Sequence, residues 1–137
     1  MDALAQEKLL DSLRDSLFTY RAKCRRVIDG DTLELDIDLG MAVSIVKKVR
    51  LRGIDTPEVY GVKKDSEEYK AGKKASEFVK EALFEDGESK TLWICTHKDK
   101  EGKYGRYIVE VWLDVDDQFV SLNTLLVDKE LAVEKDY

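Results

Sequence analysis

Residues 29–58 read DGDTLELDIDLGMAVSIVKKVRLRGIDTPE, and this stretch decides the fold. Over residues 33–39, leucine and isoleucine alternate with aspartate and glutamate, which predicts a strand with one buried face and one wet face. Gly40 and Met41 indicate a turn, and the apolar residues of 43–54 predict a further strand. The turn between the two strands is short, so we expect them to pair as an antiparallel hairpin.

Further elements lie on either side of this hairpin. They are a strand over residues 19–28 that stops at Asp29-Gly30, a helix from about 66 to 84 that Asp86-Gly87 ends, strands over residues 90–96 and 107–113, and a last helix capped by Ser121. The first three strands predict an antiparallel meander. Five short strands with a helix inserted after the third fit a five-stranded OB-fold Greek-key barrel. The predicted fold class is mainly β with helices: this barrel, the inserted helix, a C-terminal helix and an extra N-terminal helix.

The first 18 residues predict an amphipathic helix, because leucines recur there at helical spacing between charged residues. The leucines of this stripe are Leu9, Leu10, Leu13 and Leu17. We therefore divide the chain into this helix, residues 1–18, and one domain, residues 19–137. The helix could pack on the domain, pair with a partner or be the tail of a longer element, and packing on its own domain is the default. We expect a monomer, with dimerisation through this helix as the alternative.

The composition suits one ordinary domain, because the 137 residues are 43% hydrophobic and 38% charged. No apolar run approaches the roughly 20 residues of a membrane span, and charged residues interrupt any signal peptide at the N-terminus. We therefore expect a cytoplasmic protein, or a secreted one whose signal segment has been removed, and no membrane partner. Cys24 and Cys95 fall in predicted strands, where buried thiols are expected rather than a disulfide.

The net charge of −6 weighs against a nucleic acid partner, because binding a polyanion favours a basic surface. The charge is unevenly distributed, however. Residues 21–74 carry 13 basic and 10 acidic residues, whereas residues 107–137 carry 2 and 8. The part of the chain that holds the aspartates and arginines discussed below is thus basic, and the global charge is a weak objection to nucleic acid binding.

Carboxylates are expected to meet at one edge of the sheet. Asp31 follows the first strand, and Asp55 stands where the third strand ends. In a meander the first and third strands run parallel, so their carboxyl ends lie at the same edge and the two aspartates become neighbours. Two carboxylates and a backbone carbonyl, completed by water, form an oxygen cage of the kind that calcium or magnesium accepts. The alternative is a pair of ordinary turns without a ligand.

Arginines near these carboxylates suit a phosphate, because a guanidinium matches phosphoryl oxygens with two parallel hydrogen bonds. Arg50 precedes Asp55 by five residues, an odd spacing that puts the two on opposite faces of a flat strand unless Gly53 introduces a bulge or bend. Strand parity does not choose between Arg50 and Arg52. Arg106 begins the last predicted strand and could reach the same edge, the alternative being a solvated side chain.

A further carboxylate, Glu58, lies three residues past Asp55 and beyond the rigid Thr56-Pro57 step. This placement holds a carboxylate near a metal without making it a ligand. Glu58 could then orient or deprotonate a water in line with a phosphorus atom. The alternative is a surface glutamate that opens a loop. Together, the carboxylates and arginines indicate metal-assisted phosphodiester hydrolysis.

Three motifs together resemble the staphylococcal (micrococcal, or thermo-) nuclease family and its SNase-like domain. They are DGDT at residues 29–32, RLRGIDTPE at residues 50–58 and KYGR at residues 103–106; the segment that begins with Leu122-Asn123 also resembles the last helix of that family. The motifs occur in the family's order and at similar spacing, over about residues 19–133. The resemblance implies an OB-fold barrel and a calcium-dependent endo- or exonuclease. Such an enzyme hydrolyses phosphodiester bonds of DNA and RNA, favours single-stranded or frayed regions and leaves 3′-phosphate ends.

The resemblance also implies a role for each site residue. The implied ligands of Ca²⁺ are Asp31, Asp55 and the carbonyl of Thr56. The implied catalytic residues are Arg50, Glu58 and Arg106, with Glu58 as general base or water-positioning group and the arginines on the scissile phosphate. The implied substrate-binding residues are Lys103, Tyr104 and Tyr69, which border the nucleotide. The resemblance therefore selects Arg50 over Arg52.

The alternative function is a non-catalytic module of the same fold that binds nucleic acid or protein. Relatives of that kind typically lose part of the acidic and arginine set. Here the whole set is present, which favours the enzyme. Its members are Asp31, Arg50, Asp55, Glu58 and Arg106.

Overall fold

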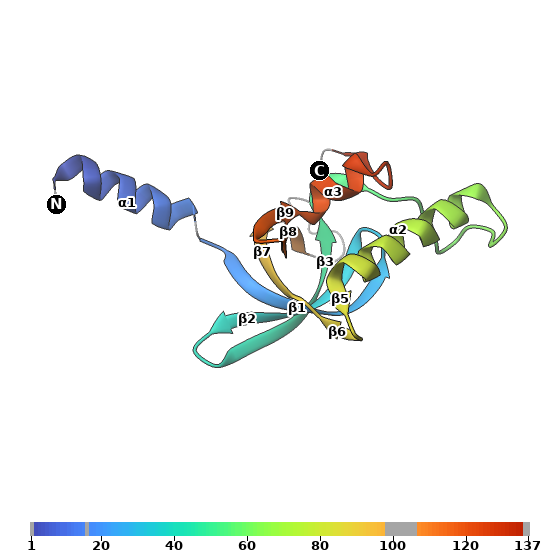
Figure 1. Ribbon diagram of the computed structural model, residues 1–137, viewed down its shortest axis with the longest axis horizontal. Helices are drawn as coiled ribbons and strands as arrows, with labels where there is room; N and C mark the ends of the chain where they lie inside the picture. Colours follow the sequence, from blue (N-terminus) through green and yellow to red (C-terminus); the bar gives the residue numbers. More distant parts are fainter. Residues whose placement is uncertain (1, 16, 98–106, 136–137) are drawn as a thin grey trace.

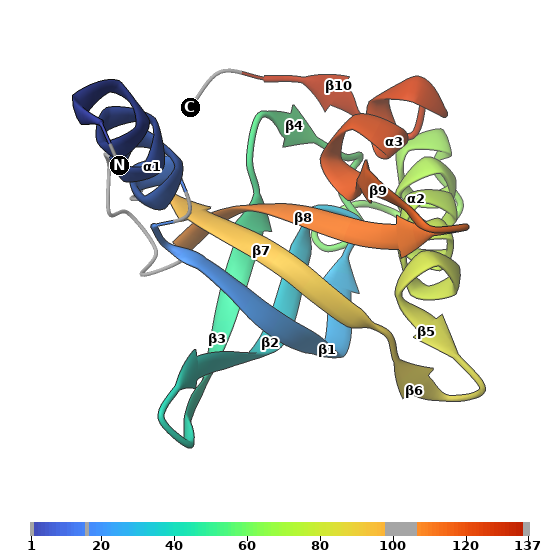
Figure 2. The same cartoon turned by 60° about the vertical axis from the view of Figure 1, so that its left-hand side comes forward.

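The computed structural model describes residues 2–15, 17–97 and 107–135, and the structural statements below concern these residues. Its barrel strands are β1 (Thr19–Asp29), β2 (Thr32–Gly40), β3 (Val43–Leu51), β7 (Thr91–His97) and β8 (Tyr107–Val115). β1, β2 and β3 form the predicted antiparallel meander, and β7 pairs antiparallel with both β1 and β8. A parallel pairing of β3 with β8 closes the sheet (Figure 1, Figure 2). The predicted OB-fold barrel is therefore confirmed.

Short strands that were not predicted join the barrel sheet or form two separate two-stranded sheets. β9 (Gln118–Ser121) pairs with β8, β5 (Phe84–Glu85) with β6 (Glu88–Ser89), and β10 (Val133–Glu134) with β4 (Ile54–Asp55). At the β5–β6 turn, Asp86 and Gly87 both have positive φ, as the central residues of a type I′ hairpin do. The prediction that Asp86-Gly87 ends the inserted helix is therefore wrong, because the helix ends earlier and this dipeptide turns a hairpin.

Strand alternation decides which side chains fill the barrel. In β2, Leu33, Leu35 and Ile37 are buried, while the acidic residues between them lie at the surface or are half-buried. They join apolar residues from every other barrel strand in one core. Cys24 is buried in this core and Cys95 is half-buried, and both are free thiols, as expected.

Two helices cover the barrel, and each begins beside a capping serine. In α2 (Glu67–Leu83), the Ser66 hydroxyl accepts a hydrogen bond of 3.1 Å from the Tyr69 N–H. In α3 (Leu122–Asp128), the Ser121 hydroxyl accepts one of 3.3 Å from the Thr124 N–H, as predicted. α2 lies against β1, and α3 lies against β8 and β9. α2 thereby packs on the strand that ends at Asp29, directly before the turn that carries Asp31.

The N-terminal helix α1 (Ala3–Asp15) projects away from the barrel (Figure 1). None of its described residues is buried, and its leucines are exposed. The predicted packing of this helix on its own domain is therefore wrong. None of the helices in the described parts of the chain is both long enough and apolar enough to cross a membrane.

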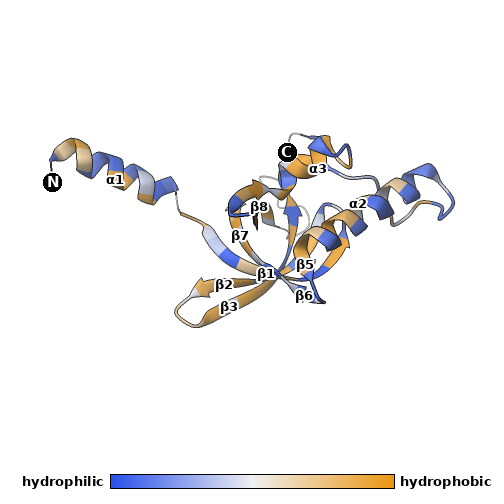
Figure 3. Ribbon diagram, in the orientation of Figure 1, coloured by the Kyte–Doolittle hydropathy of each residue, from blue (hydrophilic) through white to orange (hydrophobic). Residues whose placement is uncertain are grey.

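The β2–β3 hairpin continues past the barrel as an arm. Its exposed apolar side chains are Leu39, Met41, Val43, Ile45 and Val46. Figure 3 shows this arm mostly in hydrophobic colours. The turn is centred on Met41 and Ala42, both with positive φ, one residue later than the predicted Gly40-Met41.

Candidate functional site

A bend at the end of β3 brings Arg50 and Asp55 to the same side. β3 ends at Leu51, Gly53 has a φ of +75°, and β4 begins at Ile54. The change of direction cancels the odd spacing, so that Arg50 Nη2 donates a hydrogen bond of 2.9 Å to Asp55 Oδ1. Gly53 therefore introduces the bend that the spacing required.

Arg50 also reaches the first aspartate. Its Nη2 lies 3.3 Å from Asp31 Oδ2, so one guanidinium pairs with both carboxylates. The Arg50 side chain is 16% exposed and that of Asp31 only 5%, whereas Asp55 is more open at 34%. The structure thus places Asp31 and Asp55 together, as the meander predicted, with Arg50 between them.

Asp31 also holds the bent segment in place. Its Oδ2 accepts a hydrogen bond of 3.1 Å from the Thr56 N–H, and its main-chain carbonyl accepts one of 2.9 Å from the Leu51 N–H. Its Oδ1 accepts a hydrogen bond from the Thr32 hydroxyl at 3.1 Å. Asp31 therefore bonds both ends of the segment that contains the bend.

Burial and the neighbouring Asp29 determine the electrostatic environment of Asp31. Burial raises the pKa of Asp31 above its usual range, and a hydrogen bond and the negative charge of Asp29 raise it further. The Thr56 N–H and the charge of Arg50 oppose this rise but do not cancel it. Asp29, which we did not assign to the site, is thus its third carboxylate; the signal was its position in Asp29-Gly30-Asp31.

These oxygen atoms fit a hard divalent cation. Carboxylate oxygens of Asp31 and Asp55 and the backbone carbonyl of Thr56 are the ligand types that calcium and magnesium prefer. Besides Arg50, Lys135 lies near the site, with its Nζ 3.9 Å from Asp55 Oδ2. No sequence signal indicated Lys135, because β10 brings it to the site through a pairing with β4.

Glu58 is exposed on the loop that follows this cluster. Its carboxylate has no hydrogen bond or ion pair with any other described residue. Its exposure makes the carboxylate accessible to solvent. The loop itself lies close to α2, because a Cβ at Gly72 would come within 2.7 Å of the Pro57 carbonyl oxygen and 3.0 Å of that of Glu58.

Gly30 plays a similar part at the other end of the cluster. A Cβ there would lie 2.9 Å from Ala75 Cβ on α2 and 3.0 Å from the Thr56 side chain. Both glycines therefore let α2 approach the loop that carries the site. Sequence reasoning treated Gly30 as a turn residue and did not notice Gly72, because a glycine within a helix carries no sign of what packs on it.

Replacing Gly72 by alanine is expected to destabilise the protein by about 2 kcal/mol. The added methyl would overlap the carbonyl of Pro57 and a methyl of Val59, and overpacking of this kind outweighs the roughly 1 kcal/mol that alanine gains in a helix. Urea unfolding would measure the change, with the exposed Lys73→Ala as a control near zero. A more stable Gly72→Ala protein would contradict the close approach of α2 to this loop.

Asn123 fixes the strand end from the other side. Its Nδ2 donates to the carbonyls of Arg52, at 2.9 Å, and Val109, at 3.2 Å, and its Oδ1 accepts from the Val111 N–H at 3.1 Å. The buried amide thus ties α3 to β8 and to the residue before the bend. Leu122-Asn123 was part of the family resemblance, but no role was inferred for the amide.

The remaining predicted residues are less closely placed. Arg52 does not pair with Asp31 or Asp55. Its Nη1 instead lies 3.2 Å from Glu110 Oε1. Tyr69 is half-buried in the first turn of α2. Lys103, Tyr104 and Arg106 lie outside the described residues.

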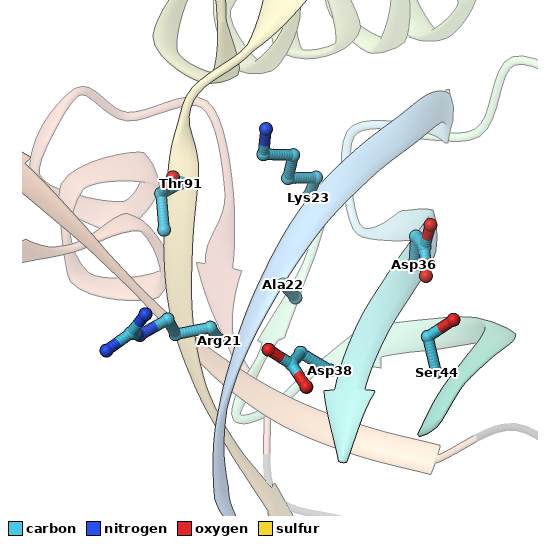
Figure 4. Close-up of a pocket in the computed structure, with 7 residues that line it drawn as sticks. All are labelled: Arg21, Ala22, Lys23, Asp36, Asp38, Ser44 and Thr91. Atoms are coloured by element: carbon cyan, nitrogen blue, oxygen red, sulfur yellow. The ribbon is translucent and has the colours of Figure 1, made fainter. Parts of the chain in front are cut away.

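A separate hollow lies on the barrel surface, between β1, β2, β3 and β7 (Figure 4). Its lining includes Arg21 and Lys23 but also Asp36 and Asp38. The mixed charge suits neither a polyanion nor a divalent cation, and none of the predicted site residues lines it. The carboxylate–arginine cluster, rather than this hollow, is therefore taken as the candidate site.

Comparisons with known proteins show the family of this chain. The model of the staphylococcal nuclease homologue family matches residues 48–137, which include Arg50, Asp55 and Glu58. Thermonuclease of Staphylococcus intermedius is 36% identical over 113 residues, 82% of this chain and 58% of the relative. Thermonuclease of Staphylococcus hyicus is 35% identical over 66% of this chain and 47% of the relative.

A more distant relative is an uncharacterised protein of Methanocaldococcus jannaschii. It is 27% identical over 79% of this chain and 56% of the relative. The chain thus spans about half the length of the curated relatives it matches. The family model covers well over half of the chain and the similarity to one thermonuclease most of it, so the chain belongs to the family of staphylococcal nuclease homologues.

Proposed function

We propose that this protein is a calcium-dependent nuclease that hydrolyses phosphodiester bonds of DNA and RNA and leaves 3′-phosphate ends. The observation that carries the proposal is the pairing of one half-buried guanidinium, Arg50, with the two carboxylates Asp31 and Asp55. Glu58 stands exposed on the loop that follows. Membership of the family and the similarity to two thermonucleases support the same activity.

In this proposal, Asp31, Asp55 and the carbonyl of Thr56 hold Ca²⁺. When bound, the ion neutralises charge on the phosphate and orients it for attack. The negative charge of Asp29 beside Asp31 supports this assignment: after burial, which is the largest cause, it contributes to the raised pKa of Asp31. A bound cation would favour the charged form of this carboxylate.

The chain's own residues then supply the remaining steps. Glu58 orients a water molecule and accepts its proton as the oxygen attacks phosphorus. The bond between phosphorus and the 5′-oxygen breaks, and this oxygen leaves with a proton from solvent, so that the phosphate stays on the 3′ side. Arg50 and Arg106 donate hydrogen bonds to phosphoryl oxygens, whose negative charge grows in the transition state. The residues that border the nucleotide are Lys103, Tyr104 and Tyr69. The proposed substrate is single-stranded or frayed nucleic acid, and the proposed enzyme acts as a monomer.

Removal of calcium is expected to lower cleavage of denatured DNA by about 10³-fold or more, because the ion stabilises transition-state charge by several kcal/mol. The purified chain would be assayed in calcium, in excess chelator, and after calcium is restored. End analysis of the products would show whether the phosphate stays on the 3′ side. Absence of cleavage in calcium, magnesium and manganese, with oligonucleotide binding retained, would favour the non-catalytic binding module instead.

A further inference from the structure

We propose that Cys95, His97 and Glu110 form a binding site for a transition metal ion of the zinc class on the outer face of the barrel. The Cys95 Sγ, a ring nitrogen of His97 and a carboxylate oxygen of Glu110 all lie within 4.8 Å of one another. This donor set contains sulfur and nitrogen, which zinc prefers and calcium does not. The site is therefore distinct in chemistry from the carboxylate cluster.

The sheet register brings the three side chains together. Leu92 and Ile94 of β7 point into the core, so the alternating residues Cys95 and His97 share the outer face. Glu110 of β8 is the direct cross-strand partner of Cys95. Neighbours at i and i+2 with a residue opposite lie within reach of one another on a sheet face, so the grouping is a property of the barrel rather than of a loop.

The distances suit a metal after a small adjustment of side chains. Tetrahedral zinc with sulfur, nitrogen and oxygen ligands at about 2.0–2.3 Å keeps neighbouring ligand atoms roughly 3.3–3.7 Å apart. His97 and Glu110 are each 34% exposed, so their side chains can close the gap without moving the core. The same exposure leaves room for a water molecule as the fourth ligand.

Arg52 stands at this cluster in the structure. Its Nη1 lies 3.2 Å from both His97 Nε2 and Glu110 Oε1. The guanidinium therefore neutralises Glu110 and contacts two of the three ligands. The side chain is half exposed and can move into solvent when a metal ion replaces it. Arg52 and the metal ion thus compete for the same two groups.

Titration of the reduced, metal-free protein with Co²⁺ tests the site without any assay of activity. We expect one equivalent to produce a thiolate-to-cobalt charge-transfer band that Zn²⁺ then abolishes. The band should vanish in Cys95→Ser, and the affinity should fall at least about tenfold in His97→Ala and Glu110→Gln. In Arg52→Gln the affinity should rise roughly fivefold, because a competing positive charge is lost.

Cys24→Ala is the matched control, because Cys24 lies in the core and burial raises the pKa of its thiol to about 12. This variant should keep the cobalt band. The inference fails if the unaltered protein gives no saturable band, if the band survives Cys95→Ser, or if Arg52→Gln binds the metal less tightly. Any of these results would leave Arg52, His97 and Glu110 as a surface ion-pair cluster only.

Discussion

Replacing Arg50 by alanine is expected to lower the rate of cleavage of denatured DNA by about 10³-fold. Arg50 is the described guanidinium that pairs with both Asp31 and Asp55, at 3.3 and 2.9 Å, and the proposed function puts it on the scissile phosphate. Loss of this charge removes hydrogen bonds that strengthen as negative charge develops. The rate would be measured at saturating calcium, so that a change in metal binding does not hide the chemical effect.

The matched control is Arg52→Ala, in the same segment but facing away from the carboxylates. Its activity should stay close to that of the unaltered protein. The melting temperature of both variants should be measured with calcium present, since Arg50 also neutralises two carboxylates and its loss weakens the fold when no cation replaces it. Equal losses of activity in the two variants, with both proteins folded, would contradict the assignment of Arg50.

Replacing Glu58 by glutamine is expected to reduce turnover by about 10²–10⁴-fold while leaving substrate binding nearly unchanged. Glutamine keeps the shape and hydrogen-bonding length of glutamate but cannot accept a proton. Because Glu58 has no partner among the described residues, stability should not change. Turnover would be measured under single-turnover conditions, and binding by fluorescence anisotropy of a labelled oligonucleotide in calcium.

Glu68→Gln provides the control, since Glu68 is an exposed glutamate in the first turn of α2. It should retain full turnover. If Glu58→Gln cleaved as fast as this control, Glu58 would not be the general base. A loss of binding without a loss of turnover would instead show that Glu58 contacts the substrate.

Much of the barrel could be predicted from the sequence. Alternation of apolar and acidic residues marks β2, and short turns mark the meander, so local patterns were sufficient there. The neighbourhood of Asp31 and Asp55 followed from topology alone. The bend was also anticipated at Gly53, the residue with positive φ, although parity could not say which arginine it would turn toward the carboxylates.

The errors arose where tertiary packing outweighs local signals. Asp86-Gly87 suits a helix end and a type I′ hairpin equally well, and the pairing of β5 with β6 decides for the hairpin. The spacing of the leucines in α1 predicted a buried face, but none of the described residues of this helix is buried. In both cases the local sequence indicated the type of element or turn but not the segment that it would pair with or pack against.

The sequence indicated which residues belong to the site better than it indicated which contacts hold them in place. Asp31, Arg50 and Asp55 come together as expected, and Tyr69 is half-buried near the start of α2. The packing roles of Gly30 and Gly72 could not be predicted, because they depend on the atoms that an added Cβ would overlap in the folded structure. Lys135 was missed because a two-residue strand pairing near the C-terminus leaves no pattern in the sequence.

The hydrogen bonds of Asp31 bear on which site residues a relative without the proposed activity would keep. The Asp31 carboxylate accepts hydrogen bonds from the Thr56 N–H and the Thr32 hydroxyl and also faces Arg50, so a mutation there harms folding together with any metal site. Glu58 makes no such bonds among the described residues, and its loss would leave a stable barrel. A lineage that abandons catalysis can therefore change the exposed glutamate freely, while the buried aspartate persists as scaffolding and gives a false sign of activity.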